Sequence, residues 1–237
     1  MLFSVTARAD EVEDILVLKA RYAASVGHLS FEAETEVLNA GAQASVPARK
    51  VRYHINLTRW SASIQGQQRF PWSVEVEMFE PTRYRMLLIG TSVSIVDSSG
   101  VTRPVTFTET QQKRIEEMVR LFIGNGGWDR DRIAVKVLRR NRPWLKPHTT
   151  TLEYIPLTRT PQFSRMEEDI DGDGLGLRTR LYDPDGRKKL ETVVTRKRLV
   201  NGMPFAEVTE TTINTSTGDI LHRSTLHNIV LERTGGG

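Results

Sequence analysis

Apolar and polar residues alternate through residues 69–100, and this period of two predicts three short antiparallel strands at 72–79, 83–89 and 93–97. In the first strand, Trp72, Val74, Val76 and Met78 fall on one face, with serine or glutamate between them. Pro81 ends that strand, because its ring fixes φ and it has no N–H to donate. The result is a sheet with one polar face and one large apolar face, and the apolar face needs a cover.

Two segments carry apolar residues at helical spacing and are predicted to supply that cover. Residues 10–26 begin with Asp10, which can cap a helix, and Gly27 is expected to end the helix. Its apolar stripe falls at Val12, Ile15, Leu18 or Lys19, Tyr22 and Val26. Residues 108–122 begin with Thr108 and Gln111, the pattern of a capping box, followed by a stripe at Ile115, Met118, Val119 and Phe122. Each segment has only one apolar stripe, so we expect both helices to lie on the sheet.

The rest of the chain continues the alternating pattern, with glycine-containing turn signals between the runs. Further strands are predicted at 31–37, 51–57, 101–107, 133–138, 151–155, around 162–166, and at 175–181, 190–200, 205–213 and 220–231. We therefore predict a mainly β (α+β) fold, in which a single curved antiparallel sheet forms a half-open barrel covered by amphipathic helices. Residues 10–233 are expected to form one domain, and residues 234–237 a disordered tail.

The composition narrows the classes of function. The 237 residues include no cysteine, which excludes thiolate metal sites, cysteine nucleophiles and lipid-bearing cysteines. The net charge of +4 comes from interspersed basic and acidic residues, so nucleic-acid binding is not favoured. No run approaches the roughly 18 apolar residues of a membrane-spanning helix. Nucleotide-binding and hydrolase motifs are absent from the sequence, and we expect no enzyme activity.

With this order of elements, the chain resembles the LolA-type periplasmic lipoprotein carriers of the outer-membrane lipoprotein-sorting superfamily. The resemblance covers residues 10–231. It rests on the helix and strand of residues 10–37, on the run 76–97 with Pro81, Arg83 and Asp97, and on residues 180–183 with Gly186 and Gly218 before the closing strand. Members of that superfamily are incomplete barrels whose helices form a lid over an apolar cavity.

The resemblance implies a periplasmic, non-catalytic carrier or chaperone that binds acyl chains of lipids or lipoproteins, with membrane-associated donor and acceptor proteins as partners. The expected cavity lining is Trp72, Val74, Val76, Met78, Tyr84, Met86, Leu88, Met118 and Phe122. Methionine side chains adapt to ligands of different shape. The alternative is that these residues pack together as an ordinary core. Residues 1–9 are expected to be a truncated export signal or disordered.

A carrier of this type is held closed by an arginine bonded to the lid backbone, and the candidates here are Arg49, Arg52, Arg59 and Arg69. Two other functions stay open at this stage. The same fold could serve as a protein-interaction or envelope-stress sensor module, or as a calcium-stabilised structural β domain.

Calcium is the one cofactor that the sequence raises. Asp169, Asp171 and Asp173 have the spacing of a calcium loop, but its twelfth position is Arg180 where a glutamate is needed. We therefore favour an acidic hairpin turn over a metal site.

Overall fold

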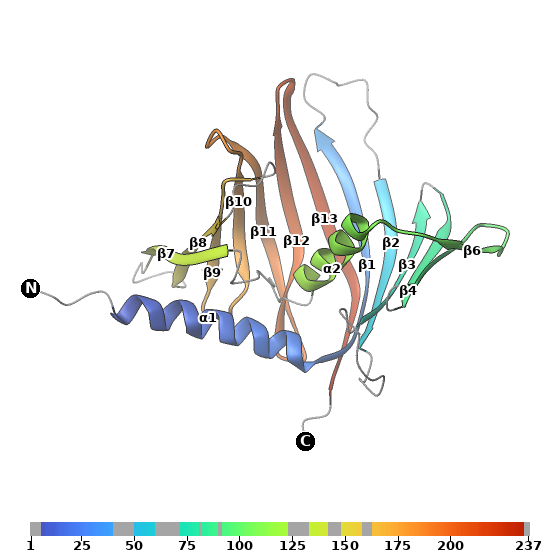
Figure 1. Cartoon of the computed structure of the whole chain (residues 1–237), viewed down its shortest axis with the longest axis horizontal. Coiled ribbons are helices and arrows are strands. Elements are labelled where there is room, and N and C mark those ends of the chain that lie inside the picture. Colours follow the sequence, from blue (N-terminus) through green and yellow to red (C-terminus); the bar gives the residue numbers. More distant parts are fainter. Residues whose placement is uncertain are drawn as a thin grey trace, which may run out of the picture. The chain divides into compact units, whose positions relative to one another are not determined.

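The computed structural model describes the backbone of residues 6–39, 50–59, 72–80, 82–89, 92–122, 133–141, 148–157 and 163–234 (Figure 1). Its elements are α1 (Thr6–Ser25), β1 (Val26–Asn39), β2 (Lys50–Arg59), β3 (Trp72–Glu80), β4 (Tyr84–Ile89), β5 (Ser92–Val96), β6 (Thr102–Val105), α2 (Glu109–Phe122), β7 (Ile133–Asn141), β8 (Thr149–Pro156), β9 (Arg165–Asp171), β10 (Gly176–Tyr182), β11 (Lys188–Val200), β12 (Met203–Thr215) and β13 (Gly218–Arg233).

The thirteen described strands form one antiparallel sheet, in the order β6-β5-β4-β3-β2-β1-β13-β12-β11-β10-β9-β8-β7. The order begins at β6 and ends at β7, so the described sheet is not closed into a ring. This confirms the predicted fold class. Among the described residues, no helix has both the length and the apolar character required to span a bilayer.

The contacts of the chain divide it into two compact units, which we describe separately. The first unit consists of residues 1–21, 37–48 and 128–223, and the second consists of residues 22–36, 49–127 and 224–237. The first unit therefore holds most of α1 and strands β7 to β12. The second unit holds strands β2 to β6, helix α2 and most of β1 and β13.

In the first unit, α1 covers the apolar face of the strands, as its stripe predicts. Val12 and Ile15 pack against a buried cluster formed by Leu152, Tyr154, Met166 and Ile170. The helix runs along this group of strands in Figure 1. Burial of these large side chains, at roughly 1.5–3 kcal/mol each relative to exposure, stabilises the packing of α1 on these strands.

A buried ion pair also links α1 to the strands of the first unit. The Lys19 ammonium lies 2.7 Å from Oε1 of Glu168, and the Tyr154 hydroxyl donates to Oε2 of the same carboxylate at 2.6 Å. Burial and the adjacent Glu168 charge raise the pKa of Tyr154 well above its usual range, so the phenol remains a donor. Gly176 leaves room for this carboxylate, since a Cβ there would lie 2.3 Å from Oε1.

Three hairpin turns use the same residue pattern, in which an aspartate is followed three residues later by a glycine. Gly100, Gly174 and Gly186 have positive φ values of 80°, 80° and 77°, and each donates its N–H to the carbonyl of Asp97, Asp171 or Asp183, respectively. Each aspartate Oδ1 also accepts two backbone N–H groups, two and four residues along the chain. The acidic run at residues 169–174 is therefore the end of β9 followed by such a turn.

In the second unit, α2 begins with the predicted capping box. The Gln111 backbone N–H donates to Oγ1 of Thr108 at 3.3 Å, and the Thr108 N–H donates to Oε1 of Gln111 at 2.9 Å. Val119 of this helix is fully buried. The apolar stripe of α2 thus contributes at least one side chain to the core of this unit.

Several element boundaries differ from those expected. The first helix begins at Thr6, not at Asp10, and β1 begins at Val26. Gly27 therefore does not terminate the helix. It lies in β1, where a Cβ would come within 3.1 Å of the backbone nitrogen of Thr234, so this glycine permits close contact between two backbone segments. The strand expected around residues 162–166 is β9, shifted toward the acidic run.

Candidate ligand-binding face

The candidate site is the apolar face of strands β1 to β6 in the second unit. The registers of the strand pairs align side chains from successive strands in rows across this face. The first row is Leu29, Leu57, Val74, Leu88, Val93 and Val105. The second row is Phe31, Ile55, Val76, Met86 and Ile95. The third row is Ala33, Tyr53, Met78 and Tyr84.

Burial decreases from the first row to the third. Five of the six side chains in the first row are buried, and Val105 is partly buried. In the second row, the residues on β4 and β5, Met86 and Ile95, are only partly buried. In the third row, Ala33 is buried, whereas the larger side chains of Tyr53, Met78 and Tyr84 are partly buried. The face therefore continues from a packed core into apolar side chains that retain contact with solvent.

Three hydroxyl groups lie where the apolar rows end. The Oγ1 atom of Thr35 lies 2.9 Å from Oγ of Ser224 on β13, and the Tyr53 hydroxyl hydrogen-bonds to Thr35. Burial raises the pKa of Tyr53, and the hydrogen bond to Thr35 only partly offsets this effect. The Tyr53 hydroxyl is therefore protonated at neutral pH and available as a donor.

The structure places seven of the nine predicted lining residues on this one face. Trp72, Val74, Val76 and Leu88 are buried, whereas Met78, Tyr84 and Met86 are partly buried. The side chains of Met118 and Phe122 lie outside the described residues. Leu87 and Ile89 alternate with these positions on β4, so they belong to the opposite face. Whether the seven residues contact a ligand remains a prediction.

Sequence reasoning left out several residues that complete the rows. The predicted lining omitted β1, β2 and β5, although Phe31, Tyr53, Ile55 and Ile95 alternate with polar neighbours in the sequence. The alternation of apolar and polar residues in the sequence indicates which face of a strand a side chain occupies. It does not indicate which residues of neighbouring strands lie in the same row. Ser224 had no local signal, because its contact with Thr35 joins positions 189 residues apart.

The opposite face of the same strands is polar and carries paired charges. Glu34 on β1 lies 2.6 Å from the Lys50 ammonium, and Arg85 on β4 pairs with Glu75 on β3 at 2.5 Å. The hydrogen bond from Lys50 lowers the pKa of Glu34. Glu34 and Glu36 of β1 therefore belong to a surface rich in ion pairs, in which Leu87 and Ile89 of β4 are apolar exceptions.

Of the four arginines considered as helix anchors, Arg59 bonds to helix backbone. Its Nη1 donates to the Ala24 carbonyl in the last turn of α1 at 2.6 Å, and its guanidinium lies 5.9 Å from the Trp72 ring centroid. Arg52 pairs instead with Glu34 and Glu80, at 3.6 and 3.9 Å. Arg49 and Arg69 lie outside the described residues.

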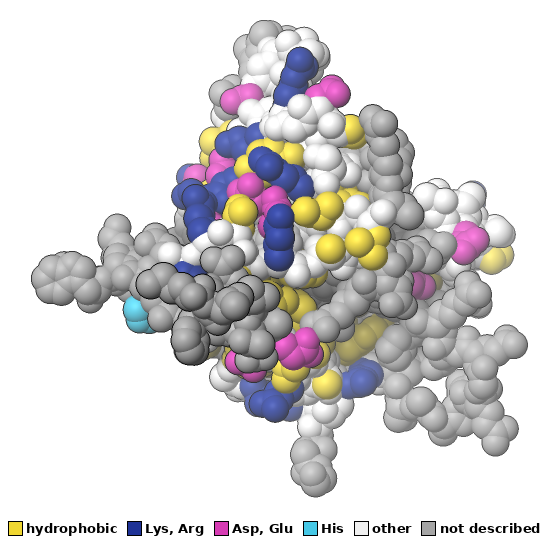
Figure 2. Space-filling view, turned by 60° about the vertical axis from the view of Figure 1, so that its left-hand side comes forward, with side chains coloured by type: hydrophobic (Ala, Val, Ile, Leu, Met, Phe, Trp, Pro, Cys, Tyr) yellow, Lys and Arg dark blue, Asp and Glu magenta, His cyan; other side chains and the backbone are white. Residues whose placement is uncertain are grey.

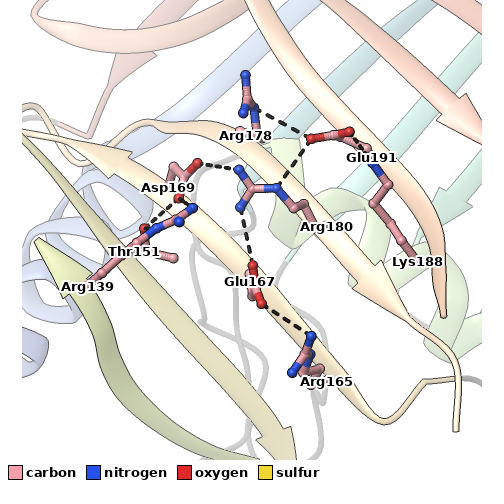
Figure 3. Close-up of polar contacts among 9 residues, drawn as sticks. All are labelled: Arg139, Thr151, Arg165, Glu167, Asp169, Arg178, Arg180, Lys188 and Glu191. Atoms are coloured by element: carbon pink, nitrogen blue, oxygen red, sulfur yellow. Dashed lines mark hydrogen bonds and ion pairs between the residues drawn. The ribbon is translucent and has the colours of Figure 1, made fainter. Parts of the chain in front are cut away.

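In the first unit, the polar face is built around Arg180 on β10 (Figure 3). Its guanidinium donates to Glu167 at 3.3 Å, to Asp169 at 2.9 Å and to Glu191 at 3.3 Å. The Arg180 side chain is only 10% exposed. The side of the molecule that comes forward in Figure 2 shows lysine and arginine side chains gathered around acidic ones.

Asp169 belongs to this network and lies between three partners. Besides Arg180, it accepts a hydrogen bond from the Thr151 hydroxyl at 2.6 Å and lies 3.8 Å from Arg139. Burial alone would raise the pKa of Asp169, but the hydrogen bonds from Thr151 and Arg180 outweigh it and lower the pKa. The carboxylate is thus held in its ionised form by neighbouring donors.

The other two candidate calcium ligands share one cation. Asp171 and Asp173 both pair with the Lys197 ammonium, at 2.8 and 3.0 Å. Within the described ranges, no group of three or more histidine, aspartate or glutamate side chains converges in a way that could hold a metal ion. The acidic run is organised by its turn and by basic side chains.

Comparison with known proteins defines the class of fold. A scan of protein-family models finds no match to this sequence, and a search of curated proteins also finds none. Solved structures do match. A DUF1329 family protein from Desulfovibrio piger has a TM-score of 0.61 and 13% identity, with 93% of each chain covered.

Two further structures match over similar lengths. An outer-membrane lipoprotein-sorting protein domain from Vibrio parahaemolyticus has a TM-score of 0.61 and 12% identity, covering 94% of this chain and 93% of that chain. A LolA superfamily protein from Nitrosomonas europaea has a TM-score of 0.57 and 13% identity, covering 94% of both chains. The chain therefore has a LolA-like fold, which confirms the resemblance found in the sequence. At these identities the similarity concerns the fold alone.

Proposed function

We propose that this protein is a periplasmic, non-catalytic carrier that binds acyl chains of lipids or lipoproteins on the apolar face of β1 to β6. The observation that carries the proposal is the graded burial of the three rows. Beyond the buried side chains of the first row, Met78, Tyr84 and Met86 continue the same face as a partly buried apolar strip. Such a strip stabilises a bound hydrocarbon chain by about 0.8 kcal/mol per buried methylene.

Two further observations support this proposal. Structures with the same fold include a domain that is described as an outer-membrane lipoprotein-sorting protein. In addition, the strip contains Met78 and Tyr84, which lie opposite each other on the adjacent strands β3 and β4. Methionine adapts its shape to different chains, and tyrosine combines an apolar ring with a polar end. Binding and release of hydrocarbon require no catalytic group.

The test is binding of a fluorescent fatty-acid probe to the purified protein and to single variants. Met78→Glu and Met86→Glu place a carboxylate among the acyl-binding side chains, so each is expected to weaken binding about tenfold or more. Leu87→Glu is the matched control, because it adds the same charge one residue away on the opposite face. Circular dichroism checks that each variant is folded.

The outcomes separate clearly. Loss of binding in both methionine variants, with binding retained in Leu87→Glu, supports the proposed face. Wild-type binding in both methionine variants would show that the acyl chain lies elsewhere. Native mass spectrometry of gently purified protein provides an independent readout, in which bound lipid is expected.

A further inference from the structure

The hydroxyl cluster formed by Thr35, Tyr53 and Ser224 gives the proposed acyl-binding face a polar end. Tyr53 belongs to the third row, beside Met78, and the other two residues continue beyond it on β1 and β13. All three side chains are partly buried. A chain lying along the rows would therefore bring its polar end to hydroxyl groups.

The cluster has hydrogen-bonding capacity left over. Three hydroxyls contribute three protons, whereas the contacts of Tyr53 with Thr35 and of Thr35 with Ser224 use two of them. Among the contacts described for these side chains, one proton and several oxygen lone pairs thus remain available. A carbonyl oxygen could accept that proton, and a ligand hydroxyl could donate to a lone pair.

The distribution of charged residues on this face determines which polar groups of a ligand can bind at the hydroxyl cluster. On the described strands β1 to β5, the positions in the three rows are all uncharged, since residues such as Glu34, Lys50 and Arg85 alternate onto the other face. Arg59 lies on the apolar face beyond the first row, next to Trp72 and away from the hydroxyl cluster. On β6, Arg103 continues the second row opposite Ile95, at the end of the face remote from β1, but it is 73% exposed and pairs with Asp97. An ionised carboxylate placed at the hydroxyl cluster would lose water without gaining a neighbouring cation, and that burial is unfavourable.

We infer that this face is selective for acyl ligands whose polar end is uncharged, such as the ester carbonyl and hydroxyls of an acylglycerol, bound at Thr35, Tyr53 and Ser224. The inference rests on the proposed function and specifies its ligand. Selectivity arises from two effects in the same direction. The hydroxyls hydrogen-bond to the ester group, and the absence of a cation beside these hydroxyls in the described rows disfavours a fatty-acid anion.

The experiment compares two ligands that share one acyl chain, monopalmitoylglycerol and palmitate, by competition with a fluorescent fatty-acid probe at a pH where palmitate is ionised. Wild-type protein is expected to bind the glyceride about tenfold more tightly than the anion. Thr35→Val and Tyr53→Phe each remove a hydroxyl with little change in shape. Each is expected to weaken glyceride binding about threefold to tenfold and to leave palmitate binding nearly unchanged.

Thr58→Val is the matched control. Thr58 is an exposed threonine on β2 whose hydroxyl contacts His28 on the polar face, so this variant is expected to bind both ligands like wild type. Equal wild-type affinity for the two ligands, or unchanged glyceride binding in both hydroxyl variants, would overturn the inference while leaving acyl binding intact. If neither ligand displaces the probe and the probe itself does not bind, the proposed function fails as well.

Discussion

The two units of this protein differ in how the apolar face of their strands is covered. Each has strands with one apolar face. In the first unit, α1 covers that face, and even its polar groups are paired, as in the contact of Lys19 with Glu168. In the second unit, the apolar face begins with buried Leu57 and Leu88 but ends with partly buried Met78 and Tyr84. In the first unit, partly buried side chains such as Ile133 and Leu181 surround a buried cluster beneath a helix. In the second unit, the partly buried side chains continue one sheet face, which we propose as the surface for a ligand.

The ion pairs on the polar faces of the two units also differ in how deeply they are buried. In the first unit, the carboxylates of Glu167 and Asp169 are 11% and 18% exposed, and both bond to Arg180. In the second unit, Glu34 is 22% exposed and its partner Lys50 is 45% exposed. The first unit therefore depends more strongly on specific polar contacts. The comparison predicts that equivalent substitutions have larger effects on stability in the first unit.

The largest effect is expected from breaking the buried ion pair that anchors α1. Lys19→Met leaves the Glu168 carboxylate without its cation in a buried setting, and we expect a loss of about 3–5 kcal/mol in the free energy of unfolding. The double variant Lys19→Met/Glu168→Met replaces both charges with apolar groups and should recover part of that loss, because the Tyr154 hydroxyl then loses Glu168 as an acceptor. Urea denaturation measures both. Equal destabilisation in the single and double variants would contradict an uncompensated charge as the cause.

Within the second unit, substitutions to alanine should destabilise the protein more in the buried first row than in the partly buried third row. Leu57→Ala removes a fully buried side chain and is expected to cost about 2–5 kcal/mol of stability. Met78→Ala, on the partly buried row, should cost clearly less stability while weakening binding of a fatty-acid probe. The measurement pairs urea denaturation with probe titration. Similar losses of stability at the two positions would mean that the third row is as tightly packed as the first.

The smallest of the three effects concerns Asp169, whose pKa is lowered in the folded protein. Such a group stabilises the fold above its unfolded pKa, near 3.8, and the contribution disappears as the pH falls through the lower folded value. At neutral pH, Asp169→Asn is therefore expected to lose about 1–3 kcal/mol, and the difference from wild type should shrink in acid below about pH 4.

Glu34→Gln is the control for this pH dependence, because its ion pair with Lys50 is more exposed. Surface pairs of this kind contribute little and are screened by salt, so we expect a smaller change that disappears at high ionic strength. Thermal melts at several pH values and salt concentrations distinguish the two variants. A pH-independent deficit in Asp169→Asn would assign the loss to packing and not to charge.

Much of the fold was predictable from local pattern. The alternation of Trp72, Val74, Val76 and Met78 placed them on one face, and Thr108 with Gln111 located the start of α2, because both signals arise within a few residues. Features made by distant residues were not predictable. Lys19 and Glu168 are 149 positions apart, and nothing near either residue in the sequence indicates its partner.

The candidate site was predictable to the same extent. The sequence identified seven residues of the apolar face, but not the rows or the gradient of burial, because these depend on the register between strands. Gly27 was misinterpreted for a related reason. A glycine after a helical pattern usually ends the helix, whereas here it allows close approach of Thr234, a residue at the far end of the chain.

Strand β13 contains one residue that interrupts its alternation. Asn228 has a positive φ of 51°, and it follows exposed His227 and precedes buried Ile229, which is the pattern of a β-bulge. Deleting Asn228 would keep Ile229 and Leu231 on their present face while shortening the strand by one residue, about 3.3 Å. The N–H of Thr234, which bonds to the Ser25 carbonyl at 2.9 Å, would then move out of position. The length of β13 is therefore matched to the hydrogen bond between Thr234 and Ser25. Position 228 should tolerate a substitution of its side chain better than the deletion of the residue.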